Sequence, residues 1–143
     1  MIVSSDNKEW LLSQLPYKAV SLTLLFRGST HGFSQSRFHQ LCDDMGPTIT
    51  IFKSKANRIF GGFTQESWDS KTRWNTDEKA FIFSIDRKQI YRVVKAIVAI
   101  YCHPEWGPNF GAAALGLGED PINKEDGGFC YTKGIDNGDI YGL

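Results

Sequence analysis

Short hydrophobic stretches with alternating or helical spacing follow one another along the chain, and polar loops separate them. Alternation with a period of two predicts a strand, which is expected over each of four stretches: 19–28, 48–53, 58–64 and 79–85. Apolar side chains three and four residues apart predict helices over 7–16 and 35–45. The pattern therefore predicts a mainly β fold of the α+β class.

The helix expected over 35–45 has the clearest signals. Ser34 precedes it and is suited to accept a backbone N–H as its N-cap, while Phe33 and Phe38 are spaced for a hydrophobic staple. Gly46-Pro47 ends the helix. The inward face is expected to carry Phe38, Leu41 and Cys42, with Arg37, His39, Gln40 and Asp43 pointing elsewhere.

The strand over 19–28 is expected to place one set of side chains in a core: Val20, Leu22, Leu24 and Phe26. The stretches 48–53 and 58–64 flank a four-residue polar loop and predict a β-hairpin. Gly61-Gly62 within its second strand indicates a bulge or a bulky aromatic side chain lying across the strand, for which Trp68 and Trp74 are the candidates.

Two regions are less regular. Residues 86–102 fit a helix, but their β-branched side chains also suit strands, and a strand is favoured over 96–102. After Pro104 the chain is rich in glycine, which favours short strands at 113–117 and 129–133 between tight turns. No internal repeat is present, so residues 1–143 are expected to form a single domain.

The composition excludes some classes of function. Sixteen basic residues balance sixteen acidic ones, whereas nucleic-acid binding normally requires a clustered positive surface. The start of the chain has no basic and apolar regions of a signal peptide, and its longest uncharged apolar run, 96–102, is far shorter than a membrane span. Three widely spaced cysteines do not form a disulfide framework. We therefore expect a protein of a reducing compartment, cytosolic (cytoplasmic) or nuclear, that neither binds nucleic acid nor inserts into a membrane.

Candidate chemistry is concentrated in residues 27–44, but each pattern is incomplete. His39 with Cys42, and Cys102 with His103, lack the paired short spacings of structural zinc sites. Ser29 and His31 are close in sequence, yet no Gly-x-Ser-x-Gly element presents the serine. The glycine-rich stretch 116–120 lacks a phosphate-binding pattern. We expect no catalytic, cofactor-binding or metal-binding residue.

Four motifs occur together in order: "LLFRGSTHGFSQSRFHQLCDDMGPTITIFKS", "IFGGFTQESWDS", "DEKAFIFSI" and "AIYCHPEWGPNFG". In this order and spacing the chain resembles the TLDc domain family over residues 19–112, with 1–18 as a helical lead-in and 113–143 as a divergent end. The matching positions are Arg27, Gly28, Ser29, Gly32, Phe33, Phe38, Cys42, Gly46, Pro47, Thr48, Gly61, Gly62, Trp68, Lys79, Ala80, Phe81, Phe83, Ser84, Gly107, Pro108, Phe110 and Gly111.

The resemblance implies a β-sandwich of two antiparallel sheets with a few short flanking helices. It also implies a non-catalytic protein-interaction module without cofactors, acting in oxidative-stress protection or by binding the vacuolar-type proton ATPase. Within 27–44, Arg27 is expected to anchor the turn after the strand, and His31 and His39 are expected to have no partner that would make them catalytic. The polar loop 65–78 and the glycine-rich end are the candidate binding surfaces.

Two departures from the family accompany the resemblance. Residues 113–135 follow its pattern only loosely, and 139–143 show nothing comparable to the family's last strand. We therefore expect a fragment or shortened variant with one sheet edge unpaired, which a partner could complete.

Two other functions stay open. One is an architectural component of a cytoskeletal, ciliary or other large assembly. The other is a small enzyme that uses the thiolate of Cys102 or Cys130, since a reactive cysteine needs an exposed, electropositive environment with a lowered pKa.

Overall fold

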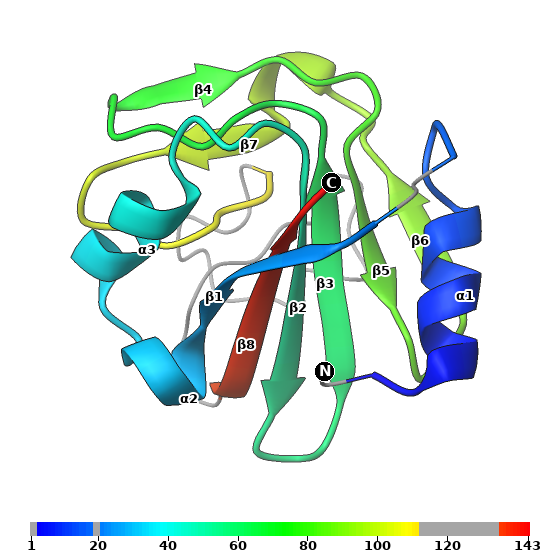
Figure 1. The fold of residues 1–143 in the computed structure, drawn as a ribbon. Coiled ribbons are helices and arrows are strands. Elements are labelled where there is room, and N and C mark those ends of the chain that lie inside the picture. Colours follow the sequence, from blue (N-terminus) through cyan, green and yellow to red (C-terminus); the bar gives the residue numbers. More distant parts are fainter. Residues whose placement is uncertain (1–2, 19–20, 112–134) are drawn as a thin grey trace.

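The computed structural model describes residues 3–18, 21–111 and 135–143 (Figure 1). The helices are α1 (Ser5–Ser13), α2 (Gly28–His31), α3 (Gln35–Cys42) and a 3₁₀ turn, η1 (Ala96–Val98). The strands are β1 (Thr23–Arg27), β2 (Thr48–Ser54), β3 (Ile59–Thr64), β4 (Arg73–Asn75), β5 (Phe81–Ser84), β6 (Gln89–Arg92), β7 (Ile100–Cys102) and β8 (Ile135–Gly142).

Two antiparallel sheets form the framework, as the resemblance implied. Six strands pair in the order β1-β8-β2-β3-β5-β6, and β4 pairs with β7 in a separate two-stranded sheet. Figure 1 shows α1 on one side of the large sheet and α3 on the other, with the small sheet across its upper end. No described helix is long and apolar enough to cross a membrane.

Each face of the large sheet has its own hydrophobic core. One core joins the sheet to α3 and the small sheet; its buried members are Phe26, Phe38, Cys42, Phe52, Trp68, Ile82, Ile100, Cys102, Phe110 and Ile140. The other joins the sheet to α1; its buried members are Val3, Leu11, Leu15, Ile49, Ile51, Phe63, Phe81, Phe83, Ile85 and Tyr141. Because both faces are covered, β2 is buried along residues 48–52 rather than on alternate positions.

The largest correction concerns the C-terminal residues. The expectation that 139–143 contain no last strand is wrong, because β8 lies between β1 and β2 and pairs antiparallel with both. Asp139, Ile140 and Tyr141 are buried there. The proposed open edge at this position is therefore occupied, and β1 and β6 are the outer strands of the large sheet.

The inward face predicted for 19–28 is only partly correct: Phe26 is buried as expected, Leu24 is not, and Val20 lies outside the described residues. The register with β8 shifts between Leu24 and Phe26, so one extra residue of β1 lies between them. Such a bulge reverses the alternation: Leu24 is 41% exposed, whereas Leu25 packs against the core on the α3 side. Leu22 packs on the opposite side, against the α1 core.

The ambiguous stretch 86–102 contains no α-helix. Gln89–Arg92 forms the outer strand β6, and the strand favoured over 96–102 is correct only for its last three residues, because Ala96–Val98 form a 3₁₀ turn. The predicted helices near 7–16 and 35–45, the hairpin and the strand near 79–85 are confirmed. The strands expected at 113–117 and 129–133 lie outside the described residues.

Gly61 and Gly62 do lie beneath aromatic rings, but not those expected. A Cβ at Gly62 would be 2.7 Å from the Phe110 ring, and one at Gly61 would be 2.5 Å from Phe83 and 2.0 Å from the Thr50 carbonyl oxygen. The β2–β3 register is continuous, so the expected alternative of a bulge is absent from this hairpin. Trp68 instead donates its indole N–H to Thr48 Oγ1 at 2.9 Å.

Candidate functional site

The reactive stretch 27–44 is divided among the end of β1, the short helix α2 and the helix α3. Ser34 caps α3 as predicted, with its Oγ accepting the backbone N–H of Arg37 at 3.4 Å. Phe38 and Cys42 are fully buried, and Leu41 packs against the same core. The predicted inward face of this helix is confirmed.

His39 is the main exception to that reading of α3. Its side chain is only 7% exposed, and both ring nitrogens face acceptors. Nδ1 lies 2.7 Å from Asp43 Oδ1, and Nε2 lies 2.8 Å and 3.0 Å from the carbonyl oxygens of His103 and Trp106. Because a carbonyl oxygen only accepts, Nε2 must carry a proton. The expectation that His39 points away from the inward face of α3 is therefore wrong: its buried imidazole joins α3 to the turn 103–106.

Asp43 receives a further hydrogen bond from the loop that follows β3. The Ser70 hydroxyl donates to Asp43 Oδ2 at 2.7 Å, and the backbone N–H of Asp44 donates to the Trp68 carbonyl oxygen at 3.0 Å. A serine nucleophile requires direct contact with its base, but here the carboxylate stands between Ser70 and His39. This arrangement fastens the end of α3 to the loop and does not activate Ser70.

His31 has a structural contact as well. Its Nδ1 accepts the backbone N–H of Arg27 at 2.9 Å, and its ring lies 5.5 Å from that of Phe26. The lone pair of Nδ1 is therefore engaged by a backbone N–H of β1. His31 therefore stabilises the junction of β1 and α2 through that nitrogen.

The Arg27 side chain was expected to anchor the turn that follows β1. It instead reaches β8. Its Nε and Nη2 donate to Asp139 Oδ1 and Oδ2 at 2.9 Å and 3.0 Å, and the Tyr141 hydroxyl donates to Oδ2 at 2.9 Å. Burial, and then the hydrogen bond to Asp139, raises the pKa of Tyr141 to about 12. These contacts satisfy the fully buried Asp139 carboxylate and fix β1 against β8.

Two of the three cysteines are buried free thiols in the core on the α3 side. Burial, and then the charge of Asp43, raises the pKa of Cys42 to about 12, and burial raises the pKa of Cys102 to about 11. A buried, protonated thiol is a poor nucleophile. Cys102 therefore lacks the environment that the enzyme alternative needs, and Cys130 lies outside the described residues.

The sequence disfavours a metal site because its candidate ligands lack the paired short spacings of such sites. Within the described ranges, no three His, Cys, Asp or Glu side chains form a group that could hold a metal ion. His39 and Cys42 do share α3, but the imidazole is engaged with carbonyl oxygens and Asp43.

The solvent side of the small sheet carries a group of partly exposed rings, which we call the aromatic surface: Trp74, Tyr101, His103 and Trp106. Trp74 lies opposite Tyr101 in the β4–β7 register, with ring centroids 4.7 Å apart. The Trp106 ring lies 5.5 Å from Tyr101 and 5.3 Å from His103. Only Trp74 belongs to the binding region predicted at 65–78.

Strand alternation explains why these rings point outward. Ile100 and Cys102 are buried in the core, so Tyr101 between them lies on the opposite face of β7. The segment before β7 adds further exposed apolar surface: Ile97 in the 3₁₀ turn is 70% exposed, and Val94, which precedes the turn, is 69% exposed. Exposed aromatic and β-branched side chains that lie close together are typical of interaction sites.

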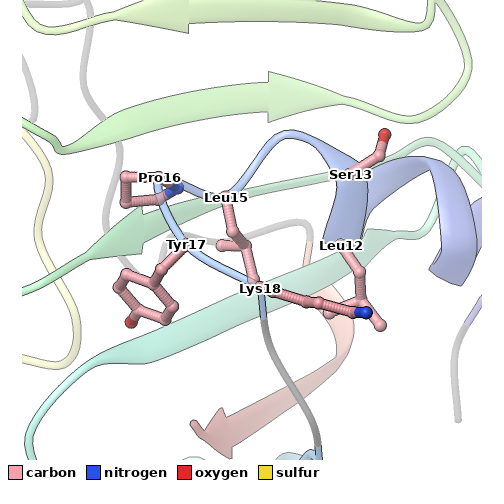
Figure 2. A pocket seen from close by; sticks show the side chains of 6 residues that line it. All are labelled: Leu12, Ser13, Leu15, Pro16, Tyr17 and Lys18. Carbon is pink, nitrogen blue, oxygen red and sulfur yellow. The ribbon is translucent and has the colours of Figure 1, made fainter.

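A shallow pocket of about 480 Å³ lies where α1 ends. It is lined by Leu12, Ser13, Leu15, Pro16, Tyr17 and Lys18 (Figure 2). Figure 2 shows the Lys18 side chain beside Leu12, with the Tyr17 ring on the other side of the loop. The ionisable side chains of this lining are Tyr17 and Lys18, and it has no carboxylate, thiol or imidazole.

Comparison with known proteins identifies the family. The model of the TLDc domain matches residues 1–133. This chain belongs to the TLDc domain family. Its TLDc match includes β4, β7 and the turn 103–106, and hence the whole aromatic surface.

Curated relatives of this TLDc chain are similar over part of it. MTOR-associated protein MEAK7 of Xenopus laevis is 39% identical over 82 residues, which are 54% of this chain and 17% of the relative. The Homo sapiens protein of that name is 37% identical over 65 residues, 43% of this chain and 14% of the relative. The Mus musculus protein of that name is 29% identical over 98 residues, which are 66% of this chain and 21% of the relative. The matched part spans about a fifth or less of these relatives.

Proposed function

We propose that residues 1–143 form a single cytoplasmic TLDc-type domain that acts as a non-catalytic protein-interaction module. The aromatic surface carries the proposal. Tryptophan and tyrosine contribute most of the binding energy in many protein interfaces, and here three such rings and an imidazole are partly exposed on one small sheet. The proposal assigns no catalytic, cofactor-binding or metal-binding residue.

The contacts of the reactive side chains support an interaction role over an enzymatic one. His39 and Asp43 fasten secondary structure elements together, Arg27 and Asp139 join two strands, and Cys42 and Cys102 fill the core. A catalytic group must be able to reach a substrate and exchange a proton or bond with it. These groups are instead engaged in stabilising the fold that presents the aromatic surface.

Two kinds of partner follow from the family and the relatives. The TLDc resemblance favours the vacuolar-type proton ATPase, with regulation of that ATPase or protection from oxidative stress as the outcome. The MEAK7 relatives are named for association with MTOR, so a complex that contains this kinase is the second candidate.

Binding of the purified chain to each purified complex tests the proposal. We expect one complex to bind, and replacement of Trp74, Tyr101 and Trp106 by alanine to weaken binding at least about tenfold, because interface aromatics commonly contribute more than 1 kcal/mol each. Leu24→Ala with Met45→Ala is the matched control, since both side chains are exposed elsewhere. Equal binding by the aromatic and control variants would contradict the proposal, as would binding of neither complex.

A further inference from the structure

We propose that the outer edge of β4 accepts an extended, uncharged segment of a partner protein as a third strand of the small sheet. The inference rests on the proposed function, because it specifies how a protein partner engages the aromatic surface. It commits to one geometry, strand addition at β4, with apolar side chains of the added segment lying on the rings.

The hydrogen bonds of β7 show which edge of the small sheet is open. The Tyr101 N–H donates to the Asn109 carbonyl oxygen at 3.0 Å, and the Gly111 N–H donates to the Ala99 carbonyl oxygen at 2.9 Å. A bridge between Ile100 and Phe110 lies between these two bonds. Residues 109–111 therefore occupy the far side of β7, and β4 is the outer strand of this sheet in the described structure (Figure 1).

The same bonds orient the backbone of β4. Because the N–H of Tyr101 points toward Asn109, Tyr101 does not exchange hydrogen bonds with the residue opposite it, which is Trp74. In an antiparallel pair, such a residue directs its own N–H and C=O away from its partner strand. The N–H and C=O of Trp74 are therefore directed to the outer edge, where an added strand would bind them.

The side chains around this edge favour an uncharged segment. Thr72 and Thr76, both exposed, flank β4, and the rings beside it carry no fixed charge. The charged side chain of β4 itself, Arg73, is paired with Asp69, with Nη2 2.6 Å from Oδ2. A segment as long as β4 would therefore meet mainly hydroxyl groups and rings, with the exposed Lys71 and Glu78 beyond the two threonines.

The Trp74 ring offers an added strand a side-chain contact as well as its backbone groups. Strand addition combines backbone hydrogen bonds with side-chain contacts at alternate positions, and the partly exposed Trp74 ring supplies one such contact beside the outer edge. The 3₁₀ turn lies on the other side of β4, because the Asp77 N–H donates to the Ala96 carbonyl oxygen at 3.0 Å from the side of β4 that faces β7.

The test follows the exchange of the Trp74 backbone amide with deuterium while a capped peptide, KTVTVTVK, is added to the full chain. The control peptide, KTVTPTVK, has a central proline that prevents strand pairing. We expect KTVTVTVK to slow exchange of this amide at least about tenfold, because a hydrogen-bonded amide exchanges only when its bond opens. The control peptide is expected to leave the rate unchanged.

Trp74→Ala keeps the amide and removes the ring, so this variant should bind the peptide more weakly and still show slowed exchange at position 74. Unchanged exchange at Trp74 at peptide concentrations up to the millimolar range would overturn the inference. If a purified complex still requires the aromatic surface, the proposed function stands and only strand addition fails. Protection of this amide that rises with protein concentration alone would identify a second copy as the occupant and overturn the inference.

Discussion

The Nε2 atom of His39 lies 3.0 Å from the carbonyl oxygen of Trp106, and this contact connects the middle of α3 to the aromatic surface. A second contact from the same nitrogen reaches the His103 carbonyl oxygen at 2.8 Å. Both residues contribute rings to that surface, so a single buried imidazole holds the turn that presents them.

Replacement of His39 by alanine is therefore expected to lower the free energy of unfolding by about 2–4 kcal/mol, because it empties a buried site and removes the hydrogen bonds to two carbonyl oxygens and the contact with Asp43. Urea unfolding measures the change. His31→Ala, which removes one contact to the backbone of Arg27, is the matched control and should lower it by about 1 kcal/mol. Equal losses in the two variants would contradict the role assigned to His39.

The ion pair between Arg27 and Asp139 gives a second prediction. Arg27→Met leaves the buried carboxylate without its cation and should destabilise the chain by about 3 kcal/mol or more. Adding Asp139→Asn removes that charge, so the double variant is expected to be more stable than Arg27→Met alone. Urea unfolding of the wild type, both single variants and the double variant measures the coupling. Additive effects would show that the two side chains do not act as a pair.

The two glycines of β3 should differ in their tolerance of a methyl group. Gly61→Ala conflicts with the Thr50 backbone at 2.0 Å, which cannot move without breaking the sheet. Gly62→Ala meets only the Phe110 ring at 2.7 Å, and this ring can shift at a loss of about 1–3 kcal/mol. We expect Gly61→Ala to be the more damaging variant by thermal unfolding. The reverse order would contradict the observed packing.

Thiol reactivity tests the burial of the cysteines. In the Cys130→Ser variant, a thiol reagent should label neither Cys42 nor Cys102 in the native state and both after denaturation, because both side chains are buried. Rapid labelling of Cys102 in the native protein would revive the hypothesis of a cysteine-dependent enzyme.

The raised pKa values of these thiols also predict sensitivity to alkali. The folded state holds the protons more tightly than the unfolded state, where the thiol pKa is 9.0. Their contribution to stability is therefore complete below pH 9 and is lost as the pH rises toward 11 and 12, the folded values. Cys42→Ala with Cys102→Ala should show a shallower decline in unfolding free energy over this range. The same pH dependence of the unfolding free energy in the wild type and the double variant would contradict the raised pKa values.

The predictions that succeeded depend on local patterns. Ser34, Phe38 and Cys42 lie within nine residues, so the cap and the inward face of α3 follow from spacing alone. The hairpin of β2 and β3 is likewise a local structure, since a short turn connects its strands.

The predictions that failed depend on contacts between distant residues. β8 contains Gly138, Asp139 and Gly142, residue types that are rare in strands, and it is a strand because β1 and β2 lie on both sides of it. The partners of His39 are backbone carbonyl oxygens 64 and 67 residues away. Every residue has a backbone carbonyl group, so the sequence does not show which of them His39 contacts. The aromatic surface could not be predicted without knowing where the 3₁₀ turn ends and β7 begins.

The most direct test of the interaction role is a hydrogen-exchange footprint of the chain bound to whichever purified complex it recognises, the vacuolar-type ATPase or the MTOR-containing complex. The account predicts slowed exchange over 73–75 and 101–106, the segments that carry the aromatic surface, with no change around Leu24 or Met45 on other exposed parts of the molecule. Slowed exchange around Leu24 and Met45, with none at 73–75 and 101–106, would contradict it.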